Sequence, residues 1–121
     1  MADSIISVFG DDTPETLRER LLDSPEFRER WLYLVTERLA GESIRCRTDA
    51  LQRIVAAEAA RVFRITAVEA ARKAIDLRDD LLAMDCDTEA TATAELLIGH
   101  VFRRSVDLCV RAVRRAIAST N

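Results

Sequence analysis

The chain has 121 residues, of which 49% are hydrophobic, 32% charged and 5% aromatic, and its formal net charge is −3 with three Gly and two Pro. A chain of this length forms one domain with a modest core, and this composition favours helices over strands and turns, so we predict a single all-α domain over residues 1–121. No apolar run is long enough to span a membrane and no secretory signal is recognisable, so we expect a cytoplasmic protein.

Residues 1–12 are predicted to form an N-terminal arm. Within it, Ser4 to Gly10 either make one or two helical turns or run as an extended segment. The stretch is largely apolar, and segments of this kind at a chain end commonly close a core. We therefore expect the arm to pack on its own domain rather than on a partner, through Ile5, Ile6, Val8 and Phe9.

Two short helices are predicted next, over residues 14–22 and 25–40. Each begins with the same signal, which is Thr13-Pro14-Glu15 for the first and Ser24-Pro25-Glu26 for the second. The hydroxyl residue caps the helix, Pro suits the first helical position, and the acid is favoured by the helix dipole. Gly41 is expected to end the second helix.

A long helix is predicted over residues 49–84, capped by Thr48, because neither Pro nor Gly interrupts it. The β-branched residues at 62–68 lower helix propensity, so a kink or break there is the alternative. The sequence Glu58-Ala59-Ala60-Arg61 returns eleven residues later as Glu69-Ala70-Ala71-Arg72, close to three whole turns, so both copies project to nearly the same side. They lie beside or within an apolar stripe of the kind that a helix normally buries: Leu51, Ile54, Val62, Ile65 and Val68.

The last helix is predicted over residues 88–119, because apolar residues recur there at spacings of three and four. The turn before it is short, so this helix must fold back antiparallel along residues 49–84 and form a hairpin with them. We predict that the hairpin and the two short helices make a bundle packed at shallow angles around Trp31, Phe63 and Phe102.

A basic stripe on the last helix is the strongest candidate site, and Asp107 is the only acid in it. Arg forks match phosphate and carboxylate groups, so the stripe is a candidate surface for an acidic protein partner or for nucleic acid. A solvated helix face is the competing interpretation, which the acidic chain and the lack of interleaved aromatic residues favour. The basic stripe consists of His100, Arg103, Arg104, Arg111, Arg114 and Arg115.

The acidic residues between Asp76 and Asp87 lie at the turn end of the predicted hairpin, whereas Arg111 and Arg115 lie at its open end. The two groups cannot meet within one hairpin. Two antiparallel copies can bring them together, so we expect a homodimer with this arrangement.

A second candidate site is the polar set on the central helix, Glu58, Arg61, Glu69 and Arg72. It can be a buried polar network or a site for a charged ligand, since a carboxylate in an apolar stripe needs a partner. We favour ion pairs three residues apart at the edge of the helix, each contributing about 0.2–0.5 kcal/mol.

No motif indicates catalysis, a metal ion or a cofactor. A di-metal carboxylate site would need Glu-x-x-His on two helices, and the chain has one histidine, His100, with Glu95 five residues before it. No nucleophile or acid is fixed beside His100 by sequence, as a general base would need. The three cysteines, Cys46, Cys86 and Cys109, have no ligand spacing and are expected to be reduced thiols.

The sequence therefore predicts a small non-catalytic helical interaction module, an adaptor, regulator or inhibitor that contacts a protein partner and forms a homodimer. It predicts no cofactor, no metal, no small-molecule substrate and no membrane association. The alternative is a nucleic-acid-associated protein that uses the basic stripe, with binding that weakens steeply as salt rises.

Overall fold

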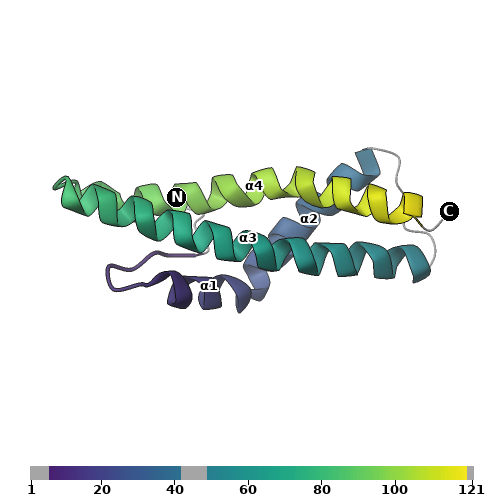
Figure 1. The fold of residues 1–121 in the computed structure, drawn as a ribbon, viewed down its shortest axis with the longest axis horizontal. Coiled ribbons are helices and arrows are strands. Elements are labelled where there is room, and N and C mark those ends of the chain that lie inside the picture. Colours follow the sequence, from purple (N-terminus) through teal and green to yellow (C-terminus); the bar gives the residue numbers. More distant parts are fainter. Residues whose placement is uncertain (1–5, 42–48, 120–121) are drawn as a thin grey trace.

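The computed structural model describes residues 6–41 and 49–119, and these residues form helices and connecting turns without any strand (Figure 1). The predicted fold of two short helices and a long hairpin is confirmed, with every helix boundary within one residue of its prediction. The predicted Thr48 cap and Cys46 lie outside the described residues. The helices are α1 (Pro14–Leu22), α2 (Pro25–Gly41), α3 (Asp49–Ala83) and α4 (Asp87–Ser119).

The two short helices begin at the hydroxyl residues that the sequence indicates. The Thr16 amide donates to Thr13 Oγ1 at 3.2 Å and the Thr13 amide donates to Thr16 Oγ1 at 2.9 Å, so the two threonines form a reciprocal cap for α1. At the start of α2, the Phe27 amide donates to Ser24 Oγ at 3.3 Å. Both caps satisfy backbone groups that have no partner inside the first helical turn.

α3 is one continuous helix, so the alternative of a break at 62–68 is wrong. It ends at a tight turn in which Asp85 adopts a left-handed conformation, with φ of 60°. The Cys86 amide donates to the Leu81 carbonyl at 2.9 Å and the Asp85 amide to the Leu82 carbonyl at 3.1 Å. These bonds satisfy carbonyl groups that the end of a helix otherwise leaves unpaired. α4 then returns antiparallel along α3 (Figure 1).

The N-terminal arm packs on its own domain, as expected, over its described residues 6–12, although Phe9 is 53% exposed and Ile5 lies outside the described residues. The helical alternative is wrong for these residues, which form an irregular segment, while Ile6 and Val8 are buried. Each of three helices contributes one charged side chain that binds the backbone of the arm: Arg20 of α1 donates to the Ser7 carbonyl, Arg78 of α3 donates to the Phe9 carbonyl at 2.7 Å, and Glu95 of α4 accepts from the Val8 amide at 2.9 Å.

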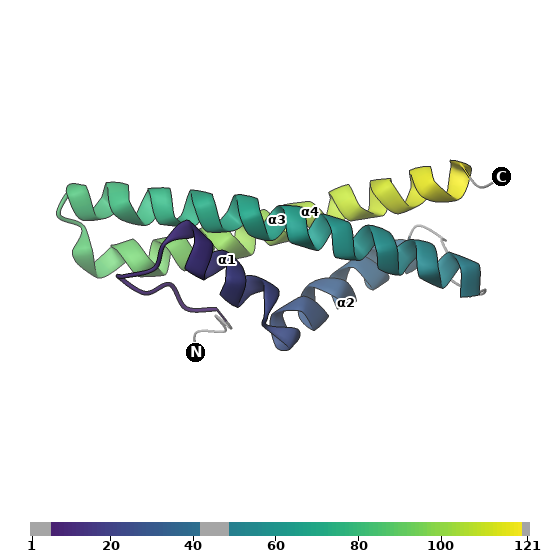
Figure 2. The same ribbon diagram turned by 60° about the horizontal axis from the view of Figure 1, so that its bottom comes forward.

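α2 crosses the hairpin and brings its aromatic residues against those of the long helices (Figure 2). The ring centroids of Phe27 and Phe102 are 4.7 Å apart, those of Trp31 and Phe63 are 5.4 Å apart, and those of Phe63 and Phe102 are 5.3 Å apart. The Trp31 indole N–H donates to the Phe102 carbonyl at 3.1 Å and to Ser105 Oγ at 2.8 Å. The predicted core around Trp31, Phe63 and Phe102 is confirmed.

The buried side of α3 differs from the predicted apolar stripe. Ile65 and Val68 are 55% and 46% exposed, and only Val62 of that stripe is buried. Five of the ten residues that α3 buries are alanines, whose small side chains let a second helix approach closely at native packing density. The alanines buried on α3 are Ala59, Ala67, Ala70, Ala71 and Ala74.

Candidate interaction surface

One long side of the hairpin is left uncovered by the other described elements. In Figure 1, α2 passes behind α3 and α4 while α1 lies below α3, so the side toward the viewer belongs to the hairpin alone. Residues on this side recur every three or four positions, apart from the adjacent Val68 and Glu69, and none of them is buried. We call this side the bare face. It consists of Ile54, Glu58, Arg61, Ile65, Val68, Glu69, Arg72, Asp76 and Asp80 on α3, and of Leu97, Val101, Arg104, Leu108, Arg111 and Arg115 on α4.

The contacts of α4 show which of its exposed residues belong to the bare face. Asp107 forms an ion pair with Arg38 of α2, so the side of α4 that carries Asp107 is directed toward α2. Cys109 is close enough to Glu58 for the carboxylate to act on its thiol, so the side that carries Cys109 is directed toward α3. The part of the α4 surface between these two sides carries Leu108 and, at helical spacing from it, Arg104, Arg111 and Arg115.

Large apolar side chains lie near the middle of the bare face. Ile65 is 55% exposed, Val68 is 46% exposed and Leu108 is 56% exposed. Single exposed apolar residues are ordinary, but a group of them on a surface that no other described element covers marks a candidate contact area.

Cys109 is fully buried between the long helices. Burial, as the largest cause, and the nearby Glu58 carboxylate raise the pKa of its thiol, and the Arg61 guanidinium opposes them, so that the pKa moves from 9.0 to about 11. The thiol is therefore protonated at neutral pH, which suits a packing residue and not a nucleophile.

The polar set of α3 lies on the bare face as ion pairs within the helix. Arg61 donates to Glu58 Oε2 at 2.8 Å from Nη2 and at 3.1 Å from Nε. Glu69 pairs with Lys73 at 2.9 Å, and not with Arg72 as the three-residue spacing suggests. The Glu58 and Arg61 side chains are 24% and 54% exposed, so this pair lies at the edge of the helix and not in a buried network. Exposed pairs of this kind contribute about 0.2–1 kcal/mol.

The basic stripe is exposed along its whole length, over about 22 Å of α4 at 1.5 Å per residue. The structure divides it between two sides of the helix. Arg104, Arg111 and Arg115 lie on the bare face, whereas Arg103 and Arg114 lie on the side of Asp107, toward α2.

The acidic end of the hairpin is also exposed, with Asp76 and Asp80 on the bare face of α3 and Asp85 in the turn. Along the hairpin, Asp80 and Arg115 are separated by about 35 Å at 1.5 Å per residue. The two charged ends of the bare face therefore cannot neutralise each other within one chain.

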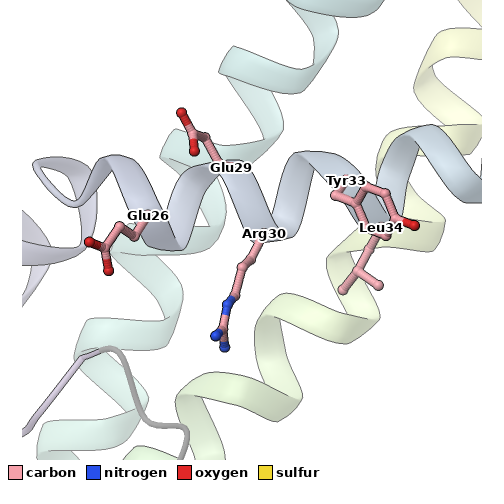
Figure 3. Close-up of a pocket in the computed structure, with 5 residues that line it drawn as sticks. All are labelled: Glu26, Glu29, Arg30, Tyr33 and Leu34. Atoms are coloured by element: carbon pink, nitrogen blue, oxygen red, sulfur yellow. The ribbon is translucent and has the colours of Figure 1, made fainter.

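A shallow hollow of about 550 Å³ follows the outer side of α2, and sequence reasoning did not identify it. Figure 3 shows that all five labelled side chains that line it come from this one helix. Glu26 and Glu29 precede Arg30 along the helix, Glu29 and Arg30 point to opposite sides in this view, and Tyr33 and Leu34 lie one turn further along. With no polar group from a second described element converging on it, this hollow lacks the geometry of a small-molecule site.

The fold and the bare face define an all-α protein built on a long antiparallel hairpin with two short helices on its other sides. No family model, no curated protein and no solved structure matches the chain. None of the described helices is long and apolar enough to cross a membrane. The described residues contain no group of three or more His, Cys, Asp or Glu side chains placed to hold a metal ion.

Proposed function

We propose that this protein is a small, non-catalytic interaction module of the cytoplasm, an adaptor, regulator or inhibitor that binds another protein chain through the bare face. The observation that carries the proposal is the exposure of Ile65, Val68 and Leu108 on the side of the hairpin that no other described element covers. Contiguous apolar surface costs free energy in water and is stabilised when a partner buries it.

The composition of the bare face supports the proposal. Its most exposed apolar residues lie near the middle, whereas its aspartates and the pair Arg111 and Arg115 lie toward opposite ends. Protein interfaces commonly have this arrangement, with an apolar centre, a polar rim and Arg among the enriched residues. The two long helices that carry the face are fixed by the aromatic core and by the arm, so the surface exists before binding and little ordering is required.

The test uses two matched substitutions on α4. Leu108→Glu places a charge on the bare face, and Leu96→Glu places the same charge at a residue that is 72% exposed and lies off that face. Each variant and the wild type serve as bait in a native cell extract treated with nuclease. We expect a protein that the wild type and Leu96→Glu retain and that Leu108→Glu loses. Equal retention by all three baits would contradict the bare face as the binding surface.

A second function, nucleic-acid association, is favoured by one observation, which is that every residue of the basic stripe is exposed. Phosphate contacts release counterions, so binding to duplex DNA would weaken steeply between 50 and 200 mM salt. It would be lost when Arg111, Arg114 and Arg115 are changed to Glu, and it would not depend on Leu108. Titration of a labelled duplex at two salt concentrations separates the two functions.

A further inference from the structure

We infer that the chain which occupies the bare face is a second copy of this protein, packed antiparallel about a two-fold axis close to Ile65 and Val68. The inference rests on the proposed function, since it names the partner of the same surface. Three features of the bare face carry it: the position of its apolar residues, the position of its charges, and its size.

The apolar residues lie where a two-fold axis requires them. α3 extends from Asp49 to Ala83, so Ile65 and Val68 lie on either side of its midpoint. In an antiparallel pair, the midpoint of one α3 meets the midpoint of the other, and Ile65 of each copy contacts Val68 of the second copy. Leu108 is a few residues beyond the midpoint of α4, and the same operation places it level with Ile98 of the second copy, within one helical turn of Val101.

The charges match when the axis lies about 26 Å along the hairpin from the turn, which is within about 3 Å of the position that Ile65 and Val68 give at 1.5 Å per residue. From the turn, Asp80 and Asp76 lie about 8 and 14 Å along the hairpin, and Arg111 and Arg115 lie about 37 and 43 Å along it, at 1.5 Å per residue. The hairpin is about 52 Å long, so reversing its direction places Arg115 at about 9 Å and Arg111 at about 15 Å on the second copy. Each arginine therefore comes level with one aspartate, and the two-fold axis repeats both pairs at the other end.

A shallow crossing of the two hairpins completes the match. The arginines are on α4 and the aspartates on α3, and packed helices commonly cross at about 20°. Over half the length of the hairpin, such a crossing carries the open end of α4 across to the turn end of the second copy's α3. Arg104 lies near the axis, where it reaches Glu69 of the second copy. A parallel pair would instead bring aspartates against aspartates and arginines against arginines, which is unfavourable.

The bare face is large enough for a stable pair. A surface about 50 Å long and two helices wide offers on the order of 1,000 Å² per copy, and standard protein interfaces bury about 800 Å² per partner. The substitutions that test the pair are confined to exposed residues: Asp76, Asp80, Arg111 and Arg115. Asp79 is left unchanged because it binds the buried Arg78.

The experiment exchanges charges and measures mass in solution by sedimentation and native mass spectrometry at micromolar concentration. We expect the wild type to be a dimer, and we expect Arg111→Asp with Arg115→Asp, or Asp76→Arg with Asp80→Arg, to raise the dissociation constant at least tenfold. An equimolar mixture of these two variants should form a heterodimer of wild-type affinity, because each substituted residue then faces residues of the opposite charge on the other variant. A matched control, Arg103→Asp with Arg114→Asp, makes the same charge change on the α2 side and should remain a dimer.

Circular dichroism confirms that each variant is folded. A monomeric wild type, charge variants that stay dimeric, or a mixture that fails to associate would each overturn the second copy or its antiparallel register. The proposed function fails by a separate result, namely equal capture by the Leu108→Glu and Leu96→Glu baits. A wild type that is monomeric but captures a protein through Leu108 would thus reject the homodimer and retain the interaction module.

Discussion

The covered and bare sides of the hairpin differ in what their residues contact. On the covered sides, aromatic rings and alanines are buried, and the buried Arg78 and the Trp31 indole have hydrogen-bond acceptors in other parts of the chain. On the bare face, large apolar side chains are exposed, and the ion pairs that α3 forms there are between its own residues. The same two helices thus stabilise the fold through the residues on their covered sides, and their bare face is left exposed for a partner. Substitutions on the covered sides should change stability, and substitutions on the bare face should change association.

The largest effect on stability is expected from Phe63→Ala. Phe63 is 4% exposed, and its ring packs against those of Phe27, Trp31 and Phe102. Removing it leaves a cavity where α2 meets both long helices, so the free energy of unfolding should fall by about 3–5 kcal/mol. Urea denaturation followed by tryptophan fluorescence measures the change. A loss below about 1 kcal/mol would show that the aromatic cluster does not hold α2 on the hairpin.

A smaller effect is expected from Arg78→Met, which keeps an apolar stem and removes the guanidinium group. Arg78 is 5% exposed, and its loss removes the charged donor that binds the Phe9 carbonyl at 2.7 Å, which leaves that carbonyl with the Asp12 amide at 3.2 Å. The free energy of unfolding should fall by about 1–3 kcal/mol. Amide hydrogen exchange should accelerate in residues 6–12 more than in α2. Arg72→Met is the control, because Arg72 is exposed on the bare face and its replacement should cost less than about 0.5 kcal/mol.

The sequence predicts the helices well because their signals are local. A hydroxyl residue followed by Pro and an acid marks the starts of α1 and α2, and the acidic stretch near Met84 correctly indicates the end of α3. The aromatic core was also predictable, because large apolar residues at helical spacing on three helices have few other places to pack.

The buried side of α3 was not predictable from its pattern of large residues. Alanine carries a weak hydrophobic signal, yet close contact between helices selects it, so the alanines are buried while Ile65 and Val68 are exposed. The burial of Arg78 was not predictable either, because an arginine in a charged stretch is normally solvated and its partner is the backbone of a distant arm.

The charged residues of the candidate site can be selected from the sequence, but the sides of the hairpin on which they lie cannot. The doubled Glu-Ala-Ala-Arg pattern indicates that both copies share one side of α3, and the structure places Glu58 and Glu69 on one face. The basic stripe looks continuous in the sequence, whereas the position of α2 assigns Arg103 and Arg114 to a different side from Arg111 and Arg115. A division of this kind depends on where a third helix packs, and no local pattern encodes it.

A third prediction concerns the pH dependence of stability through Cys109, on the covered side of α4. Burial raises the pKa of this thiol from 9.0 to about 11. Between these values the unfolded chain loses the thiol proton before the folded chain does, so stability is full below pH 9 and falls as pH rises toward 11. The loss should be about 1–2 kcal/mol at pH 11, at 1.36 kcal/mol per pKa unit with allowance for partial solvation.

The Cys109→Ala variant is the control for this prediction. It should be less stable at pH 7 because of the small cavity, but the difference between wild type and variant should shrink between pH 9 and 11. Other titrating groups are common to both chains and cancel in the comparison. A difference that stays constant with pH would show that the thiol is solvated in the folded protein.

The smallest effect on stability is expected from Ile65→Glu, and this prediction tests the difference between the covered sides and the bare face most directly. Ile65 is 55% exposed, so a carboxylate there remains in water and the helix is unchanged. At a concentration where the chain is monomeric, the free energy of unfolding should change by less than about 0.5 kcal/mol.

Ala67→Glu, two residues further along α3, is the matched control: Ala67 is 0% exposed, and burying a charge there should cost several kcal/mol, about the penalty for an unpaired ion in a protein interior. If both variants lose stability equally, the bare face is part of the folded core and no surface is left for a partner. If only Ala67→Glu loses stability while Ile65→Glu abolishes association, then the Ile65 side chain contributes little to the fold of its own chain and acts through contact with another chain.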